Sequence, residues 1–306
     1  MKKLLFALLH AAGVTRLAAW RNRRRVVFLC YHGVTERTTR AAHDPHGIHV
    51  PAPLFERQLD YLVSRYRVIP LSEYLAARRE GRRLPPYCAV LTFDDGFRNF
   101  LTAAAPRLAA RRLPASLFVI TDKTADEDDA GNDSAAHDAL RWSPADDLTH
   151  LSWSELRALA REHGFEIGSH TCSHSRLPSL TPAETERELR DSFAAVALLA
   201  GEGAPALSYP KGDYSSVLAR LARSVGYACA VTVDGGANDP AHTDPFALGR
   251  HLIGDRDDRA AFAVRVSGVR DSLARLRAAC RRLFPAAARQ PRAEVRLRAG
   301  GTTEHY

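Results

Sequence analysis

The stretch Ala89-Val90-Leu91-Thr92-Phe93-Asp94-Asp95-Gly96 decides the fold, because it joins an apolar run directly to a polar turn. A short apolar run of this kind predicts a strand that is buried on both faces, as in a parallel sheet. Two adjacent carboxylates then stand at the strand's carboxyl end. In parallel α/β architectures that end carries the active site, so the stretch indicates both an architecture and the place of its chemistry.

Similar apolar runs alternate with segments of helical periodicity along most of the chain. Strands are predicted at residues 26–31, 89–93, 116–120, 166–169, 206–209, 228–233 and 248–253. Helices are predicted at residues 54–64, 97–112, 154–163, 181–199 and 215–224. This alternation predicts an α/β protein with a parallel sheet and helical crossovers. Seven strands within about 230 residues favour one closed or nearly closed barrel over two domains.

The barrel domain is assigned to residues 25–284, with an acidic surface insertion at residues 122–147 and a disordered tail at residues 285–306. Residues 1–24 carry leucines at helical spacing beside basic residues, which predicts a basic amphipathic helix lying on the protein or on a membrane. The run also resembles the start of a signal peptide, so export stays open. The expected location is cytoplasmic or peripheral at the inner membrane face.

The composition narrows the class of protein. The chain has 306 residues, 45% of them hydrophobic, and a formal net charge of +8. Much of the excess charge lies in arginines near the two ends, which suits an anionic membrane or acidic polymer, or simply a solvated face. Nucleic acid is not an expected partner, because no binding motif accompanies the charge. The five cysteines match no disulfide framework and indicate a reducing compartment.

Polar residues follow several predicted strands at the same end. His32 follows the first strand, Asp94 and Asp95 the second, His170 the fourth, and Pro210-Lys211 the fifth. Because these ends face one rim of the sheet, residues far apart in sequence are expected to meet there. This convergence is the main physical reason to treat them as one site.

One carboxylate with two histidines is a complete ligand set for a catalytic divalent metal, and a second carboxylate remains as a base. His170 and His174 would share one face if a helical turn begins at the strand end. Gly96 would let the backbone turn so that both carboxylates point inward. A helix-capping Asp-Asp-Gly turn is the structural alternative. Zinc is the first choice of metal, with cobalt, nickel, manganese and iron also compatible.

The chain resembles the polysaccharide deacetylases, a carbohydrate esterase family. Thr92-Phe93-Asp94-Asp95-Gly96 matches that family's first motif in full, and His170-Thr171-Cys172-Ser173-His174 matches the second. The resemblance extends over about residues 26–255 and implies a distorted seven-stranded α/β barrel. It also implies that Asp94 is the catalytic base and that Asp95, His170 and His174 hold the metal.

The later part of the chain departs from the family's other motifs. Ser208-Tyr209-Pro210-Lys211 stands where the family has Arg-x-Pro-Tyr, and no late Leu-x-Leu-x-His motif is found. A branch resembling the biofilm poly-N-acetylglucosamine deacetylases carries its acid histidine near the N-terminus, in a Cys-Tyr-His segment. Cys30-Tyr31-His32 matches it, so His32 is the expected general acid. Arg250 is a candidate to orient Asp94, and Tyr209, Pro210 and Lys211 are candidates for substrate and oxyanion contacts.

These features together predict a metal-dependent hydrolase that removes N-acetyl groups from the amino sugars of a glycan. Two alternatives stay open. The first is a metal phosphoesterase with the same ligands, and the second is an inactive deacetylase-like protein that binds or assembles glycan.

Overall fold

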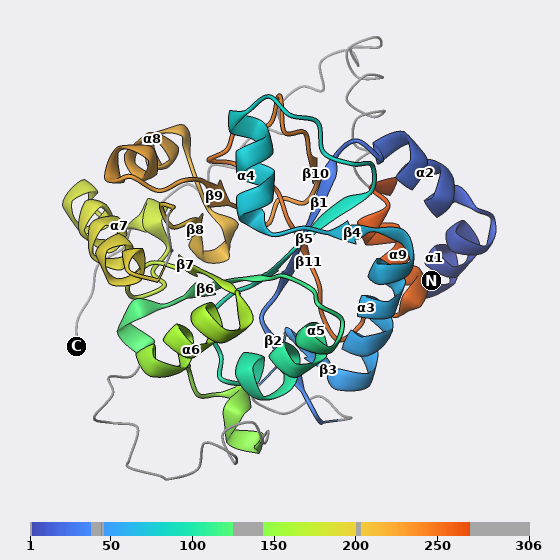
Figure 1. Ribbon diagram of the computed structural model, residues 1–306, viewed down its shortest axis with the longest axis horizontal. Helices are drawn as coiled ribbons and strands as arrows, with labels where there is room; N and C mark the ends of the chain where they lie inside the picture. Colours follow the sequence, from blue (N-terminus) through green and yellow to red (C-terminus); the bar gives the residue numbers. More distant parts are fainter. Residues whose placement is uncertain (1, 38–43, 45, 125–142, 200–202, 270–306) are drawn as a thin grey trace, which may run out of the picture.

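The computed structural model describes residues 2–37, 44, 46–124, 143–199 and 203–269. A largely parallel sheet crosses the centre of the molecule, and helices surround it (Figure 1). The strands are β1 (Val26–Tyr31), β2 (Gly33–Thr35), β3 (His49–Pro51), β4 (Arg67–Val68), β5 (Cys88–Phe93), β6 (Ser116–Val119), β7 (Glu166–Ser169), β8 (Leu207–Ser208), β9 (Ala230–Val231), β10 (Ala237–Asn238) and β11 (His251–Leu252).

The central strands pair in parallel in the order β1-β5-β6-β7-β8-β9. The segment from Leu248 to Leu252 then joins the two ends of this row. Leu248 bridges to Val231 of β9 in parallel, and β11 pairs in parallel with β1 through His251 and Leu252. The pairings therefore run round a ring of seven strand segments, which agrees with the distorted barrel expected from the sequence.

Strand alternation divides the core into an inner and an outer layer. Cys88 and Val90 of β5 pack with one cluster of buried side chains, whereas Leu91 and Phe93 pack with another. Continued at the same period, Thr92 and Asp94 point to the side of Cys88 and Val90. The inner face of β5 therefore changes from apolar to polar at its carboxyl end.

The sequence places the turn after β5 at Gly96, and the structure shows that it begins one residue earlier. Asp95 has φ 71° and Gly96 has φ 72°, both in the left-handed region. A side chain at Gly96 would also meet Val119 of β6 at 3.0 Å. The backbone conformation of Asp95 itself therefore turns the second carboxylate away from a regular strand geometry.

The helices that cover the sheet are α1 (Lys2–Ala11), α2 (Val14–Asn22), α3 (Ala52–Arg65), α4 (Leu71–Arg79), α5 (Ala105–Ala110), α6 (Trp153–His163), α7 (Pro182–Ala197), α8 (Ser216–Val225) and α9 (Arg259–Val266). Shorter helical segments are η1 (Phe100–Ala104), η2 (Thr121–Lys123), η3 (Pro144–Asp147), η4 (Leu177–Ser179) and η5 (Pro210–Gly212). No helix in the described part of the chain is both long enough and apolar enough to cross a membrane.

The predicted single helix over residues 1–24 is two helices in the structure. Gly13 has φ 74° and separates α1 from α2. Both helices pack against α9 at one end of the molecule (Figure 1). Helices α4 and α9 were not predicted, because their short apolar patterns are interrupted by alanine and arginine.

The predicted acidic insertion is partly wrong as a surface feature. Residues 125–142 lie outside the described part of the chain, as do residues 270–284 of the predicted barrel domain and the predicted tail at 285–306. Residues 143–147, however, form a capped turn whose two acidic side chains are buried. Asp146 pairs with Arg98 at 2.9 Å, and Asp147 accepts a hydrogen bond from Asn99 at 3.1 Å. These contacts fix the end of the insertion beside the turn that follows Asp95.

Candidate active site

Asp94 follows β5 and forms a two-point ion pair with Arg250 inside the ring of strands. Nη1 of Arg250 lies 2.7 Å from Oδ1 of Asp94, and Nη2 lies 2.7 Å from Oδ2. The side chains are 0% and 3% exposed. Burial alone would raise the pKa of Asp94, but the Arg250 guanidinium outweighs it and holds that pKa well below its usual range. Asp94 is therefore ionised at neutral pH.

Three other groups hold Arg250 in this position. Its Nε donates to the carbonyl of Thr232 at 3.0 Å, and Nη1 donates to Oγ1 of Thr92 at 2.9 Å. Nη2 donates to Oγ of Ser208 at 2.9 Å, and that hydroxyl in turn donates to Oδ2 of Asp94 at 3.1 Å. The structure thus places Arg250, the sequence candidate for orienting Asp94, in direct contact with both carboxylate oxygens.

Asp95, His170 and His174 bring three further ligand atoms together beside this pair. Nε2 of His170 lies 3.5 Å from Oδ1 of Asp95, and Nε2 of His174 lies 3.7 Å from the same oxygen. That oxygen is buried and has no hydrogen-bond partner in the described part of the chain. Nδ1 of His170 lies 2.8 Å from the carbonyl of Ser208, which can only accept, so Nδ1 carries the proton and Nε2 offers a lone pair.

The donor set fits a divalent metal ion. Two imidazoles and one carboxylate present their ligand atoms within 4.8 Å of one another, and no described residue donates a hydrogen bond to the carboxylate oxygen between them. Burial, followed by the charge of the neighbouring His170, lowers the pKa of His174 to about 4. His174 is therefore neutral at neutral pH, the state in which an imidazole binds metal. The hydrogen bond from His170 to Ser208 is the outer support typical of a metal-binding histidine.

Strained backbone gathers at this cluster. Positive φ angles occur at six described residues other than glycine, and four of them lie here. These four are Asp95 (71°), Thr171 (67°), His174 (63°) and Lys211 (60°). Such conformations cost about 1 kcal/mol or more each and persist where the surrounding structure enforces them, which is typical of functional sites.

The predicted helical turn from His170 to His174 is wrong. Left-handed residues at Thr171 and His174 bend the chain instead, and Oγ1 of Thr171 accepts the amide N–H of His174 at 3.2 Å. Glu188 of α7 accepts two more amide N–H groups of this loop, at 2.9 and 3.0 Å. The imidazoles still meet, with ring centroids 4.7 Å apart, but through a braced loop and not through helical spacing.

His32 lies beside Asp94, at the end of β1. A ring nitrogen of His32 lies within 4.8 Å of a carboxylate oxygen of Asp94 and of the sulfur of Cys30. Its Nδ1 is buried without a hydrogen-bond partner among the described residues. Burial lowers the pKa of His32, and the charges of Asp95 and Asp94 oppose that effect. The structure therefore brings His32 into the same cluster as both carboxylates.

Residues 81–230 match the family model of the polysaccharide deacetylases. The chain carries a polysaccharide deacetylase domain. The matched range contains Asp94, the cluster of Asp95, His170 and His174, and residues 209–211. His32 and Arg250 lie outside it, and it is the fold that brings them beside Asp94.

Relatives of this deacetylase domain agree with that assignment. A Bacillus subtilis (strain 168) protein named as a polysaccharide deacetylase, YxkH, is 25% identical over 214 residues, covering 70% of this chain and 66% of that protein. The poly-beta-1,6-N-acetyl-D-glucosamine N-deacetylase of Escherichia coli (strain K12) is 24% identical over 276 residues, covering 80% of this chain and 39% of that protein. The chain thus spans just under two thirds of the first relative and about two fifths of the second.

A solved structure shares the fold of the deacetylase domain. The Streptococcus pyogenes deacetylase PplD in complex with acetate superposes with a TM-score of 0.64 at 20% identity. The match covers 79% of this chain and 98% of that one. The parallel sheet with surrounding helices is therefore an architecture already seen in a deacetylase.

The three candidates for substrate and oxyanion contacts in the deacetylase domain, Tyr209, Pro210 and Lys211, differ in what their side chains and amide groups contact. Tyr209 is buried, and its hydroxyl donates to the carbonyl of Phe246 at 3.2 Å, away from the carboxylates. Its amide N–H donates to Val231 at 3.1 Å, and proline has none. Of the three, Lys211 alone has an amide N–H that donates to no backbone carbonyl among the described residues. Lys211 lies in η5, just after β8, and has φ 60°.

Two residues that contact Asp94 were not singled out as site residues from the sequence. Ser208 joins Asp94, Arg250 and His170 through its hydroxyl and its carbonyl. The thiol of Cys30 points to Oδ2 of Asp94 at 3.4 Å, and burial raises the pKa of that thiol well above its usual value. A serine and a cysteine at strand ends carry no distinct sequence signal. They could have been found only by aligning their strands beside β5 and noting that both side chains point to the same face of the sheet as Asp94.

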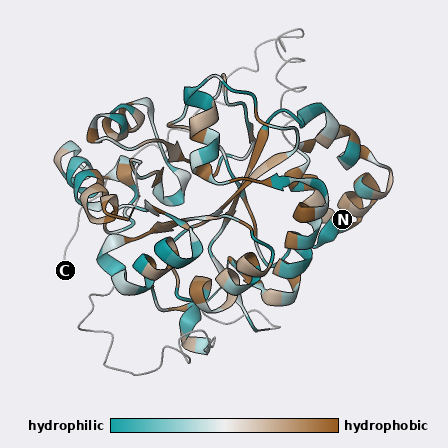
Figure 2. Ribbon diagram, viewed as in Figure 1, coloured by the Kyte–Doolittle hydropathy of each residue, from teal (hydrophilic) through white to brown (hydrophobic). Residues whose placement is uncertain are grey.

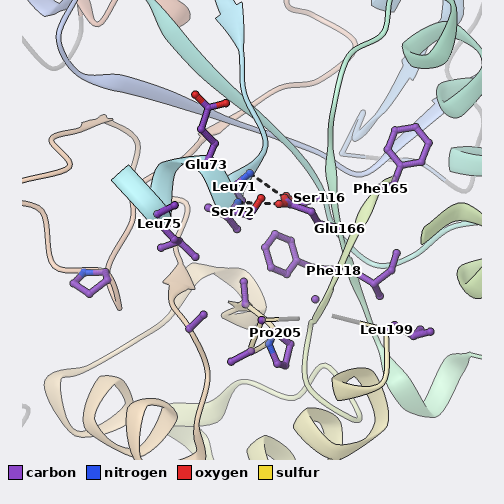
Figure 3. A pocket seen from close by; sticks show the side chains of 18 of the residues that line it. Leu71, Ser72, Glu73, Leu75, Ser116, Phe118, Phe165, Glu166, Leu199 and Pro205 are labelled. Atoms are coloured by element: carbon purple, nitrogen blue, oxygen red, sulfur yellow. Dashed lines mark hydrogen bonds between the residues drawn. The ribbon is translucent and has the colours of Figure 1, made fainter. Parts of the chain in front are cut away.

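A cavity of about 1110 Å³ lies at the opposite end of the strands and is not this site (Figure 3). Glu166 begins β7 there and closes part of the wall. Its carboxylate accepts the amide N–H groups of Leu71 and Ser72 at 2.9 and 2.8 Å, and the hydroxyl of Ser116 at 2.6 Å. Glu166 thus caps the first turn of α4 from another strand, a stabilising role.

Replacing Glu166 by alanine should lower the free energy of unfolding by about 2 kcal/mol, because three donors lose a charged acceptor. Denaturant unfolding measures the difference. Glu162→Ala, at an exposed position of α6, is the matched control and should change stability by about 0.5 kcal/mol or less. Equal unfolding midpoints for the two variants would show that the cap contributes nothing.

Proposed function

We propose that the protein is a metal-dependent amidohydrolase that removes N-acetyl groups from the amino sugars of a glycan. The observation that carries the proposal is the division of labour between adjacent carboxylates. The charge of Arg250 balances that of Asp94 and keeps this carboxylate ionised. Asp95 offers two imidazole nitrogens a buried oxygen that has no hydrogen-bond partner among the described residues. One carboxylate is thereby prepared for proton transfer and the other for a cation.

Asp95, His170 and His174 would hold the ion, with zinc as the first choice and cobalt, nickel, manganese or iron as alternatives. A divalent ion held there would supply Lewis-acid chemistry, polarising an amide carbonyl and acidifying a water molecule. Asp94 would accept the proton of the attacking water. Because Arg250 keeps the proton affinity of Asp94 low, this carboxylate can act as a base only toward a strongly acidified water.

Two further groups would complete the reaction. The amide N–H of Lys211 would donate to the oxyanion that forms when water adds to the acetamide carbon. His32 would deliver a proton to the departing amine, since it lies beside Asp94 and its buried Nδ1 has no hydrogen-bond partner in the described part of the chain. The products are acetate and an amino sugar.

His32→Ala should lower kcat for acetate release by about 100-fold or more, because general acid catalysis contributes on that scale. Its fold should persist, since Nδ1 of His32 makes no hydrogen bond within the residues that the structure describes. His242→Ala is the matched control, because that side chain is 82% exposed. An unchanged kcat in His32→Ala would remove this histidine from the mechanism.

The substrate class is proposed from the chemistry of the site and from the Escherichia coli relative named for poly-beta-1,6-N-acetyl-D-glucosamine deacetylation. The position of His32 before the carboxylates in the sequence supports a place among the poly-N-acetylglucosamine deacetylases, the branch with its acid histidine near the N-terminus. The test is acetate release by the purified protein, stripped of metal and reloaded with each candidate ion. The substrates are β-1,6-linked and β-1,4-linked N-acetylglucosamine oligomers.

The same samples distinguish the two alternatives. A phosphoesterase would release phosphate from a phosphomonoester and no acetate. An inactive glycan-binding protein would bind metal and oligomer but release neither product. Metal-dependent acetate release at either linkage supports the proposal, and a metal-loaded, folded protein that releases none contradicts it.

A further inference from the structure

The N-terminal helices leave several large apolar side chains exposed. We define the N-terminal patch as the following residues of α1 and α2: Leu4 (66% exposed), Leu5 (53%), Leu8 (59%), Leu17 (59%) and Trp20 (53%). Figure 2 shows apolar and polar residues mixed along both helices, which lie across the molecule from α7 and α8 (Figure 1). Exposed apolar groups gathered in this way mark an interaction surface.

The opposite face of the same helices is anchored to the domain. Ala18 of α2 is buried with Val264 of α9, and Phe6 and Leu9 of α1 pack against this cluster. The side chain of Asn22 donates to the carbonyl of Ser267 at 3.0 Å. The helices therefore have an inner face that fixes them, and the patch is what their outer face presents.

The charge around the patch has one sign. Residues 1–25 contain seven basic side chains and no acidic one: Lys2, Lys3, Arg16, Arg21, Arg23, Arg24 and Arg25. Arg16, Arg21 and Arg24 are exposed on α2 or directly after it, next to Leu17 and Trp20. The guanidinium of Arg23 lies 4.5 Å from the centre of the Trp20 ring. Leucines, an amphipathic tryptophan and flanking arginines are the residues favoured at a membrane–water interface.

We propose that the N-terminal patch docks the protein onto an anionic lipid surface, with α1 and α2 lying in the plane of the headgroups. Charge complementarity selects this occupant. Two copies meeting through the patch would bring their arginines face to face, which is unfavourable. Leucine and tryptophan gain by insertion among acyl chains, while the arginines gain by contact with lipid phosphates. This inference is independent of the proposed deacetylase activity.

Co-sedimentation of the full chain with vesicles tests the proposal. Phosphatidylcholine vesicles with about 30% phosphatidylglycerol should retain the protein at about 0.05 M salt, and pure phosphatidylcholine vesicles should retain much less. Raising the salt to about 0.5 M should weaken binding, because surface charges are then screened within a few ångströms. Trp20 emission should shift to the blue on binding, and Trp20→Phe should lose that shift.

Variants of the patch separate its two contributions. Leu8→Glu with Leu17→Glu should reduce vesicle affinity by more than tenfold, through loss of insertion. Arg16→Gln and Arg24→Gln should each reduce it by about fivefold. Val217→Glu is the matched control on α8, since Val217 is 61% exposed and lies outside the patch. All five substituted positions are exposed, so thermal unfolding should be unchanged.

The outcomes divide clearly. Anion-dependent binding that the patch variants lose and Val217→Glu keeps supports the proposal. Absence of vesicle binding at low salt overturns it, as does binding that the patch variants leave intact. A dimer in solution that Leu8→Glu with Leu17→Glu dissociates, without vesicle binding by the parent protein, would assign the patch to a second copy instead.

Discussion

Asp95→Asn is expected to abolish metal retention. In the proposed ligand set of Asp95, His170 and His174, Asp95 would supply the only anionic ligand, and its Oδ1 is the atom that faces both imidazole nitrogens. Loss of the outer groups that merely orient metal ligands already costs about 10–100-fold in affinity, so loss of the carboxylate should exceed about 100-fold. Metal content after gel filtration, with zinc titration of the stripped protein, measures this effect.

Asp94→Asn is the matched comparison, because it makes the same chemical change one residue away. It should keep the metal and lower kcat for acetate release by about 100- to 10,000-fold, through loss of the base. If Asp95→Asn binds zinc as tightly as the parent protein, the ligand assignment is wrong. If Asp94→Asn retains full acetate release, the base is another group.

Arg250→Leu should lower the free energy of unfolding by about 3–5 kcal/mol, because it leaves the Asp94 carboxylate buried without its counter-charge. The parent ion pair is almost fully buried, with both N–O distances at 2.7 Å. Without Arg250, burial should also raise the pKa of Asp94, so any remaining stability should increase as the pH falls and that carboxyl becomes protonated. Denaturant unfolding over a range of pH measures both effects.

Two controls make this result specific. Arg190→Leu removes an exposed ion pair on α7, with Glu186 at 2.7 Å, and should cost about 0.5 kcal/mol or less. The double variant Asp94→Asn with Arg250→Leu should lose less stability than the sum of the two single variants, since neither charge is then left alone. Strict additivity would show that the pair is not coupled.

The sequence predicted the fold where apolar runs were long and regular. β1 has the predicted bounds, and α3 and α6 lie within two residues of theirs, because a continuous run or a clear helical period defines each. The strands at β8, β9 and β11 are only two residues long, although the sequence predicted four to six. Their apolar residues pack in the core without continuous ladder pairing, and composition alone does not distinguish these two states.

For the site, the sequence predicted which residues meet better than it predicted the backbone that holds them. Carboxylates and histidines at strand ends were recognisable as residue types, but the backbone that joins the histidines was not. Left-handed angles at Thr171 and His174 depend on Glu188 and on neighbouring strands, and nothing in the local sequence specifies them. Ser208 was missed for a similar reason, because its contacts with Asp94, Arg250 and His170 exist only in the assembled sheet.

The closing segment from Leu248 to Leu252 has a consequence for the order in which the protein is made. Asp94 and its counter-ion are 156 residues apart in the chain, so a growing polypeptide on the ribosome exposes the carboxylate long before the guanidinium. Until residue 250 emerges, burial of the strand end after β5 would leave a charge without its partner. The ion pair of Asp94 and the pairing of β11 with β1 therefore both depend on the same late part of the chain.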